Sequence, residues 1–130
     1  MKAFFDTNIL IYAQGRSGKA ERARALLAAG GLVSVQVLNE FAAVSRRKLG
    51  KDWRDIAEAL EDARALVGPP IPLTLALHET ALALARDHGV SFHDALILAA
   101  ALEAGCDTLY SEDMPHDRAF GRLKIVNPFP

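Results

Sequence analysis

Short apolar runs alternate with longer stretches of helical periodicity along this chain, and that alternation limits the folds it can adopt. The apolar runs that predict strands lie at residues 3–5, 32–33, 108–110 and 123–126, with a weak edge strand at 71–73. Helical patterns lie between them, at residues 9–29 with a break near 15–18, then at 34–49, 52–67, 74–88 and 91–104. Strands joined through helices favour a parallel sheet with helices on both faces, because parallel connections need long right-handed crossovers. The sequence therefore predicts an α/β fold.

Capping residues mark where most of these helices begin. Ser34, Asp52, Thr74 and Ser91 each stand directly before a helical pattern, and the segment from Ser91 to Asp94 has the spacing of a capping box. Glycines follow several of the patterns and predict their ends. The boundaries of the predicted elements therefore rest on local chemistry as well as on periodicity.

The length of 130 residues fits one domain, residues 1–130, and is too short for two ordinary ones. A content of 51% hydrophobic and 24% charged residues is typical of soluble globular proteins and argues against a disordered chain. The longest apolar run, 95–102, is much shorter than a membrane span, and the N-terminus lacks the features of a signal peptide. The single cysteine, Cys106, excludes an internal disulfide and argues against a thiolate metal site. We expect a soluble cytoplasmic protein.

The small net charge of −1 hides an uneven distribution of charge along the chain. Residues 1–54 contain ten Lys and Arg against four acids, whereas residues 55–130 contain five against twelve. Five of the cations crowd into positions 46–54, next to Trp53. Such a cluster could bind a polyanion, with Trp53 stacking on a base. The alternatives are a solvated helix end for the cations and packing against Ile56 and Ala57 for Trp53.

Two acids stand just after predicted strands. Asp6 follows the run 3–5 and Asp113 follows the run 108–110. The carboxyl ends of parallel strands meet at one edge of a sheet, and that edge is where α/β proteins bind ligands. Each acid has an ordinary alternative, since Asp6 can serve as a helix N-cap and Asp113 can belong to a polar turn. Their shared position makes both of them candidates for a site.

Two further acids lie on predicted helices. Around the helix axis, Asp94 is within about 80° of the apolar stripe, so it starts the buried face of the helix. A capping box explains part of that placement. Glu40 is nearly opposite the main apolar face of its helix, and a surface position is its default interpretation. If the sheet brings the four carboxylates together, they repel one another and cannot all stay ionised alone. Oxygen ligands without cysteine suit Mg²⁺ or Mn²⁺, which would support phosphoryl transfer.

The residues around these acids resemble those of a known family. The matching segments are Phe5 to Leu10, Asn39-Glu40, His93 to Leu96, Ser111 to Met114 and Val126 to Phe129. Together they resemble a PIN-domain ribonuclease and, more narrowly, a VapC-type toxin of a toxin–antitoxin pair. The resemblance covers nearly the whole chain in order and length.

This resemblance implies a three-layer α/β/α PIN-like fold with a central parallel sheet of four or five strands. It also implies a Mg²⁺- or Mn²⁺-dependent endoribonuclease acting on single-stranded RNA, with Asp6, Glu40, Asp94 and Asp113 as catalytic, metal-binding residues. Asp6 and Asp94 would hold the principal ion, and Glu40 and Asp113 would act through water or a second ion. Water would be the nucleophile, so the expected products carry a 5′-phosphate and a 3′-hydroxyl.

The resemblance extends to neighbouring residues and to partners. It implies that Asn8 and Ser111 orient the ligating carboxylates. Asp117 is the nearest candidate for the further acid of the family, with a loop or surface role as its alternative. VapC-like toxins form homodimers and are held inactive by an antitoxin whose tail fills the groove beside the acids. We expect the same partners here.

Other functions compete with this interpretation. The chain could be a PIN-like module that binds RNA or protein without cleaving, although the intact set of acids speaks against it. A phosphatase or receiver domain commonly needs a lysine after a late strand, and residues 108–117 contain none. His93 and His116 could act as general acids, but exposed or capping roles are the alternative for every histidine of the chain. The glycines form neither a dinucleotide-binding motif nor a P-loop.

Overall fold

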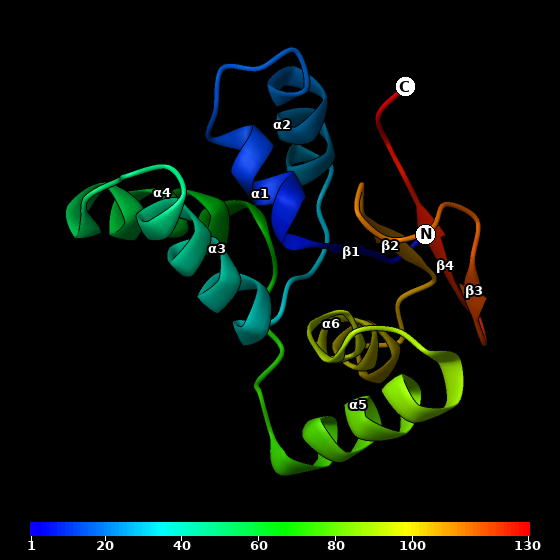
Figure 1. Cartoon of the computed structure of the whole chain (residues 1–130). Coiled ribbons are helices and arrows are strands. Elements are labelled where there is room, and N and C mark those ends of the chain that lie inside the picture. The colour runs from blue at the N-terminus through cyan, green and yellow to red at the C-terminus, as the bar shows by residue number, and fades with distance from the viewer.

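A four-stranded sheet in the order β1-β2-β4-β3 forms the centre of the computed structural model, which describes residues 1–130 (Figure 1). β1 is Ala3–Phe5, β2 is Thr108–Tyr110 and β4 is Leu123–Val126, and these three strands are parallel. β3, Ala119–Phe120, pairs antiparallel with β4 at the edge. This last strand falls within a stretch for which the sequence predicts only a loop.

Six helices surround the sheet. They are α1 (Thr7–Ala13), α2 (Ala20–Ala28), α3 (Val35–Arg47), α4 (Trp53–Leu66), α5 (Leu75–His88) and α6 (Phe92–Glu103). α6, backed by α5, covers one face of the sheet, and α1 and α2 lie on the other side (Figure 1). α3 and α4 pack beside them next to β1 (Figure 1). The predicted three-layer α/β/α fold is therefore confirmed.

The predicted helix caps are confirmed as well. The hydroxyls of Ser34, Thr74 and Ser91 each accept a hydrogen bond from the backbone N–H three residues on, at 3.1 to 3.2 Å. The Asp52 carboxylate does the same for α4 at 2.8 Å. The first helix begins earlier than its apolar pattern predicts, at Thr7, because Asp6 is its N-cap.

The predicted strand at 32–33 is reduced to a single parallel bridge between Phe4 and Leu32. Leu32 exchanges backbone hydrogen bonds of 2.9 Å with Ala3 and Phe5, but Ser34 already caps α3, so no room is left for a longer strand. The weak strand at 71–73 is likewise one bridge, between Ser34 and Ile71. These two bridges extend the sheet beyond β1 without adding regular strands.

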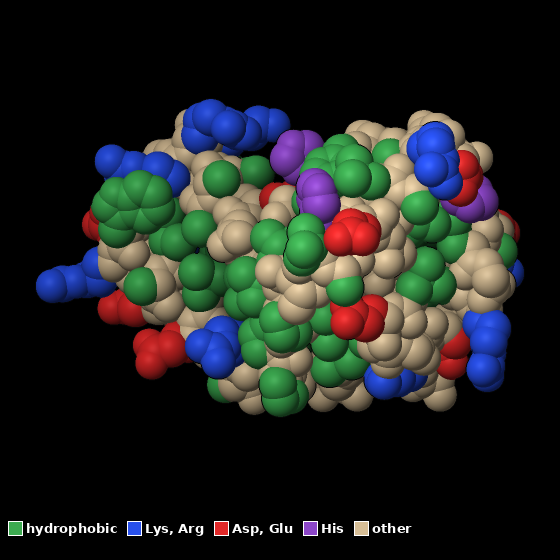
Figure 2. Space-filling model, turned by 90° about the horizontal axis from the view of Figure 1, so that it is seen from below, with side chains coloured by type: hydrophobic (Ala, Val, Ile, Leu, Met, Phe, Trp, Pro, Cys, Tyr) green, Lys and Arg blue, Asp and Glu red, His purple; other side chains and the backbone are tan.

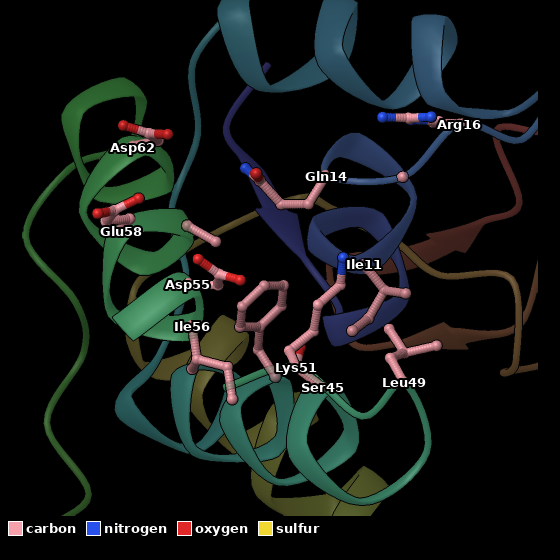
Figure 3. Close-up of a pocket in the computed structure, with 13 residues that line it drawn as sticks. Ile11, Gln14, Arg16, Ser45, Leu49, Lys51, Asp55, Ile56, Glu58 and Asp62 are labelled. Atoms are coloured by element: carbon pink, nitrogen blue, oxygen red, sulfur yellow. The ribbon is translucent and has the colours of Figure 1, made fainter. Parts of the chain in front are cut away.

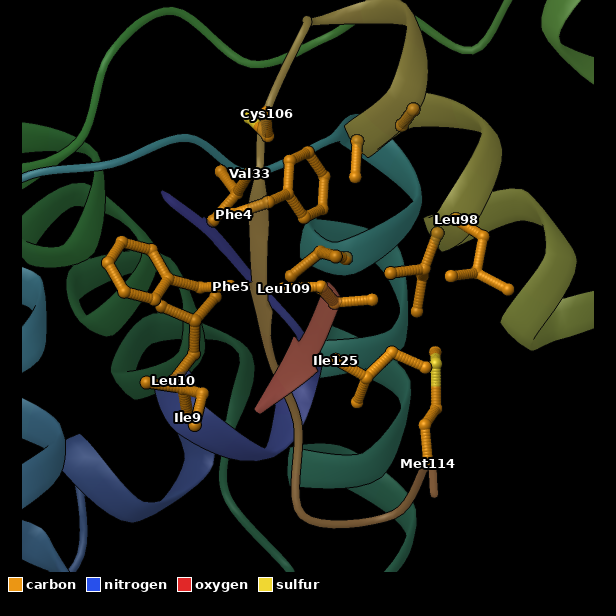
Figure 4. Packing of buried hydrophobic residues seen from close by; sticks show 14 of the residues in the cluster. Phe4, Phe5, Ile9, Leu10, Val33, Leu98, Cys106, Leu109, Met114 and Ile125 are labelled. Carbon is orange, nitrogen blue, oxygen red and sulfur yellow. The ribbon is translucent and has the colours of Figure 1, made fainter. Parts of the chain in front are cut away.

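The hydrophobic core lies on both sides of β1 and β2. Phe4, Leu98 and Leu109 are fully buried in it together with Ile125 (Figure 4). Seven consecutive residues of α6, from Ala95 to Ala101, are buried, so this helix is enclosed rather than amphipathic. Such packing holds the carboxyl ends of β1 and β2 and the start of α6 in fixed positions. None of the helices is long and apolar enough to cross a bilayer.

Candidate active site

The carboxyl ends of β1 and β2 place two predicted site residues side by side. The Asp6 N–H donates to the Tyr110 carbonyl at 3.0 Å, which extends the ladder by one residue beyond β1. Ser111 follows β2 directly, and its N–H donates to the Val126 carbonyl at 3.1 Å. Asp113 lies two residues further along. Asp6 and the start of this loop therefore lie together at one edge of the sheet, as expected.

Asp6 is a carboxylate with little access to water, since only 4% of the residue is exposed. Its Oδ1 accepts from the Thr7 N–H at 2.6 Å, which makes Asp6 the N-cap of α1. Its Oδ2 accepts from the Ser111 hydroxyl at 2.7 Å and from the Asn8 amide at 3.4 Å. The capping role and the site role of Asp6, which the sequence leaves as alternatives, are compatible in one geometry.

Burial dominates the electrostatics of Asp6. The pKa of this carboxyl is raised from 3.8 to about 6, mainly by loss of hydration, and the charges of Asp94 and Asp113 contribute to this shift. The hydrogen bonds from Ser111 and Thr7 oppose this shift. The fold therefore leaves Asp6 poorly compensated as an anion, and a cation at this place would favour its ionised form.

Asn8 connects two of the acids. Its amide nitrogen donates to Asp113 Oδ2 at 3.1 Å as well as to Asp6, and its carbonyl oxygen accepts from the Glu112 N–H at 3.3 Å. Ser111 makes a similar link, because its hydroxyl also accepts from the Met114 N–H at 3.2 Å. Both residues thus fix the loop after β2 against the start of α1. Asp113 itself is exposed.

Glu40 is joined to the same site by Thr7, a residue that the sequence analysis did not single out. The buried Thr7 hydroxyl donates to Glu40 Oε2 at 2.9 Å, and the Gln36 amide, one helical turn earlier on α3, donates to Oε1 at 3.2 Å. Its place directly after Asp6 is the only signal in the sequence for Thr7. Glu40 is therefore half-buried and held in place, and its default interpretation as a surface glutamate is wrong.

Asp94 lies in the first turn of α6, where its N–H donates to the Ser91 hydroxyl at 3.2 Å. Burial raises the pKa of the Asp94 carboxyl, and the charges of Glu40 and Asp113 raise it further. The Ser91 hydroxyl lowers it. Asp94 thus interacts with acids from α3 and from the loop after β2, and Asp6 interacts with Asp94 in turn.

The four acids therefore face a common region, but they do not form a closed cage. No three acidic, histidine or cysteine side chains lie close enough together to ligate one ion. Mg²⁺ usually bonds directly to only one or two carboxylates and keeps several waters, and hard cations prefer oxygen ligands. Two buried or half-buried carboxylates with raised pKa values, and two more nearby, fit such a partly hydrated ion.

Asp117 and His116 lie apart from this region, whereas His93 borders it. Asp117 has a left-handed backbone with φ 69°, and its carboxylate lies 3.3 Å from Lys124 Nζ and 3.4 Å from His116 Nε2. None of its hydrogen bonds or ion pairs reaches the four acids. His116 also accepts from the Asn127 N–H at 2.9 Å. His93 is largely exposed, with Nδ1 3.4 Å from Glu40 Oε1.

A second cluster, absent from the sequence analysis, supports the loop that carries Asp113. Glu112 lies 2.5 Å from Lys19 Nζ and accepts from the Tyr12 hydroxyl at 2.8 Å. The Tyr12 ring packs edge-on against Phe129, with ring centroids 5.2 Å apart. Three distant parts of the chain meet here, so helical or strand periodicity contains no signal for the contact.

A groove of about 570 Å³ lies between α1, α3 and α4, away from the acids (Figure 3). Ile11, Phe41 and Ile56 provide apolar walls. Charged side chains of both signs border it, including Lys51 and Asp55. None of the four acids lines this groove.

The chain is similar to several proteins of known structure. Among solved structures, the chain is similar to VapC20 from Mycobacterium tuberculosis, a toxin that cleaves the sarcin-ricin loop. The two share 25% identity with a TM-score of 0.69, over 86% of this chain and 90% of that chain. A toxin–antitoxin complex from Klebsiella pneumoniae is similar at 22% identity and a TM-score of 0.72, with 98% of both chains covered.

VapBC2 from Rickettsia felis, bound to a DNA fragment from its promoter, is similar at 20% identity and a TM-score of 0.69, over 96% of this chain and 97% of that chain. None of the curated proteins matches the chain. A family model for the PIN domain matches residues 3–120, which include all four acids. The chain therefore belongs to the PIN-domain family.

Proposed function

We propose that this protein is a metal-dependent endoribonuclease that cleaves single-stranded RNA, and that it is the toxin of a toxin–antitoxin pair in the cytoplasm. The observation that carries the proposal is the buried Asp6 carboxyl, whose pKa is raised to about 6 and which interacts with the charges of Asp94 and Asp113. A site that collects negative charge in this way favours a hard cation. The similarity to VapC20 at 25% identity supports the same reaction class.

Each acid has a distinct part in the proposed reaction. Asp6 and Asp94 would hold the principal Mg²⁺ or Mn²⁺, because they are the two acids whose pKa values burial raises. Asp113 and Glu40 would act through water or hold a second ion. A bound divalent ion supplies charge neutralisation at phosphorus and lowers the pKa of a water.

Groups of the protein do the positioning. The Ser111 hydroxyl and the Thr7 backbone N–H fix the two oxygens of Asp6, and the Asn8 amide holds Asp113 beside it. Thr7 and Gln36 hold Glu40. One of the carboxylates could also accept a proton from the attacking water. Because water is the nucleophile, the products would carry a 5′-phosphate and a 3′-hydroxyl.

Cleavage of a fluorescent single-stranded RNA by the purified protein tests this function. Chelation by EDTA should abolish cleavage, and added Mg²⁺ or Mn²⁺ should restore it. Asp6→Asn and Asp94→Asn should each reduce the rate about a thousandfold or more, since ion binding contributes several kcal/mol to the transition state. Full cleavage by both variants would contradict the assignment. Binding of RNA without cleavage under any metal would favour a PIN-like binding module instead.

We further propose that an antitoxin and a second copy of the chain are partners of this protein. The family resemblance implies an antitoxin tail in a groove beside the acids. The groove between α1, α3 and α4 lies away from them, and its apolar walls and charged border suit another segment of an antitoxin. Leu49→Glu, within the groove, should weaken a copurified complex, whereas Leu66→Glu, equally exposed but outside the groove, should not. Light scattering should give about twice the monomer mass of 14.0 kDa for the isolated protein. A monomer would contradict the proposed homodimer.

A further inference from the structure

The turn between α3 and α4 carries the densest positive charge of the chain. All of its cations are exposed, and none belongs to any of the five ion pairs of the structure. They are Arg46, Arg47, Lys48, Lys51 and Arg54, and we call this set the basic turn. Asp52 is the single acid among them, and its carboxylate is occupied as the N-cap of α4. The cations of the basic turn are therefore exposed and unpaired, although Asp55 borders the same groove as Lys51.

Helix stability explains only part of this charge. Arg46 and Arg47 lie in the last turn of α3, where cations interact favourably with the helix dipole. Lys51 and Arg54 flank the start of α4, where the dipole disfavours a cation. The positions of Lys51 and Arg54 are therefore unfavourable for the helix itself, which points to an anion outside the chain as their partner.

Trp53 lies within the basic turn and is 61% exposed. The Arg46 guanidinium carbon lies 5.1 Å from the centroid of its ring, and the same side chain donates to the Lys51 carbonyl at 3.1 Å. Packing against Ile56 and Ala57, the alternative suggested by the sequence, does not bury the ring. An aromatic face backed by a guanidinium and open to solvent is suited to stacking on a base.

The basic turn also lies on the same side of the molecule as Glu40. Arg47 is seven residues after Glu40, so the two lie on the same face of α3 and about 10 Å apart along its axis. Figure 2 shows Lys and Arg side chains along the upper edge of the side occupied by α3 and α4, with acidic side chains below them and histidines near the centre of that face. A strand that reaches Glu40 can continue over the basic turn.

We propose that the basic turn and Trp53 form a docking surface for single-stranded RNA outside the cleavage site, with a base stacked on Trp53 and phosphates beside Arg47 and its neighbours. This inference rests on the proposed ribonuclease function. RNA suits the surface because it alternates anionic phosphates with aromatic bases, as the basic turn alternates cations with an open indole. An acidic polypeptide would use the charges but would leave the indole face without an equivalent partner.

Fluorescence anisotropy with a labelled single-stranded RNA of about twelve nucleotides tests the surface. EDTA prevents cleavage, and a KCl titration gives the salt dependence. Trp53→Ala should raise Kd about tenfold, while Trp53→Phe should stay within about threefold of the wild type, because it keeps a stacking ring. Arg47→Ala should lower the slope of log Kd against log salt by about 0.7. The control Arg64→Ala, in an exposed and unpaired cation of the last turn of α4, should change neither quantity.

Unchanged binding by Trp53→Ala and Arg47→Ala would overturn the inference. So would polyglutamate binding as tightly as RNA with the same dependence on Trp53, since it would assign the surface to an acidic polypeptide. Cleavage assays separate this inference from the function on which it rests. A wild type that cleaves RNA while the variants bind normally refutes the docking surface alone. Weaker binding by the variants, in a protein that cleaves nothing with any metal, supports the surface and refutes the nuclease.

Discussion

Among single residues, Asp6 has the environment that is least suited to its charge. The side chain must stay where it is because it caps α1 and accepts from Ser111, yet the fold removes most of its hydration. A neutral amide of the same shape would keep the Thr7 contact without the cost of burying an anion. Asp6 is thus kept at the expense of stability, as functional carboxylates often are.

The raised pKa of Asp6 predicts a dependence of stability on pH. Because the pKa is about 6 in the folded protein and 3.8 in its ordinary state, ionisation disfavours the fold. The contribution of this group to folding stability is fully present below pH 4, decreases between pH 4 and pH 6, and is lost above pH 6. The difference corresponds to about 3 kcal/mol. We therefore expect the free energy of unfolding of Asp6→Asn, measured by urea denaturation in EDTA, to increase relative to that of the wild type by about this much between pH 4 and pH 7. A constant difference across this range would contradict the shift.

Ser111 should be important for both stability and activity. Its hydroxyl is fully buried, donates to Asp6 Oδ2 and accepts from the Met114 N–H. Ser111→Ala removes the acceptor of the Met114 N–H, leaves Asp6 Oδ2 with only the Asn8 amide at 3.4 Å, and removes a bond that lowers the pKa of Asp6. We expect a loss of about 1–3 kcal/mol in the free energy of unfolding, measured by urea denaturation, together with weaker cleavage. Ser17→Ala is the control, because its exposed hydroxyl accepts a single hydrogen bond, from the Lys19 N–H at 3.3 Å, and we expect a smaller loss of stability and unchanged cleavage.

At the scale of elements, the segment between α2 and α3 shows why one predicted strand is incomplete. Gly31 passes so close to β1 that a Cβ there would lie 2.5 Å from Phe5 Cε2 and 3.0 Å from the Ala3 carbonyl oxygen. The segment adds one bridge to the sheet and then turns into α3 at Ser34. This close passage, rather than a long strand, connects α3 and Glu40 to the side of β1.

Gly31→Ala should therefore destabilise the protein. The new methyl group must displace the Phe5 ring, which is fully buried, or move the backbone away from β1. Overpacking of this kind lowers the free energy of unfolding by about 1–3 kcal/mol. Thermal unfolding measures the loss, with Gly18→Ala as the matched control, because nothing lies within 4 Å of a Cβ at that position. Equal melting temperatures for the two variants would contradict this prediction, because they would show that the Phe5 ring or the backbone moves aside at little cost.

Elements with local signals could be predicted from the sequence, and those that depend on distant partners could not. Ser34, Thr74 and Ser91 cap helices through contacts three residues away, so their pattern is visible in the chain itself. β3 has two residues and depends on pairing with β4. Periodicity does not place Glu40 in the site for the same reason, since its link to Thr7 joins residues 33 positions apart. The family resemblance supplied what periodicity could not.

For the whole molecule, the site brings together parts of the chain that would otherwise repel. The junction between β1 and α1, α3, α6 and the loop after β2 each contribute one acid, and Asp94 interacts with Glu40 and Asp113 across these elements. A divalent cation that binds the folded state alone would reduce the repulsion among them. Its effect should therefore appear in global unfolding and not only in the local structure of the site.

Added Mg²⁺ or Mn²⁺ should raise the melting temperature of the protein at neutral pH. A concentration of about one hundred times Kd stabilises a fold by about 2.7 kcal/mol. For a domain of this size that corresponds to about 10 °C. The double variant Asp6→Asn/Asp94→Asn should lose most of the shift, since it removes the two acids proposed to hold the ion, whereas Asp117→Asn should retain it, because Asp117 pairs with Lys124 instead. An equal shift in the double variant would place the cation elsewhere on the surface and would separate the acids from the chemistry proposed for them.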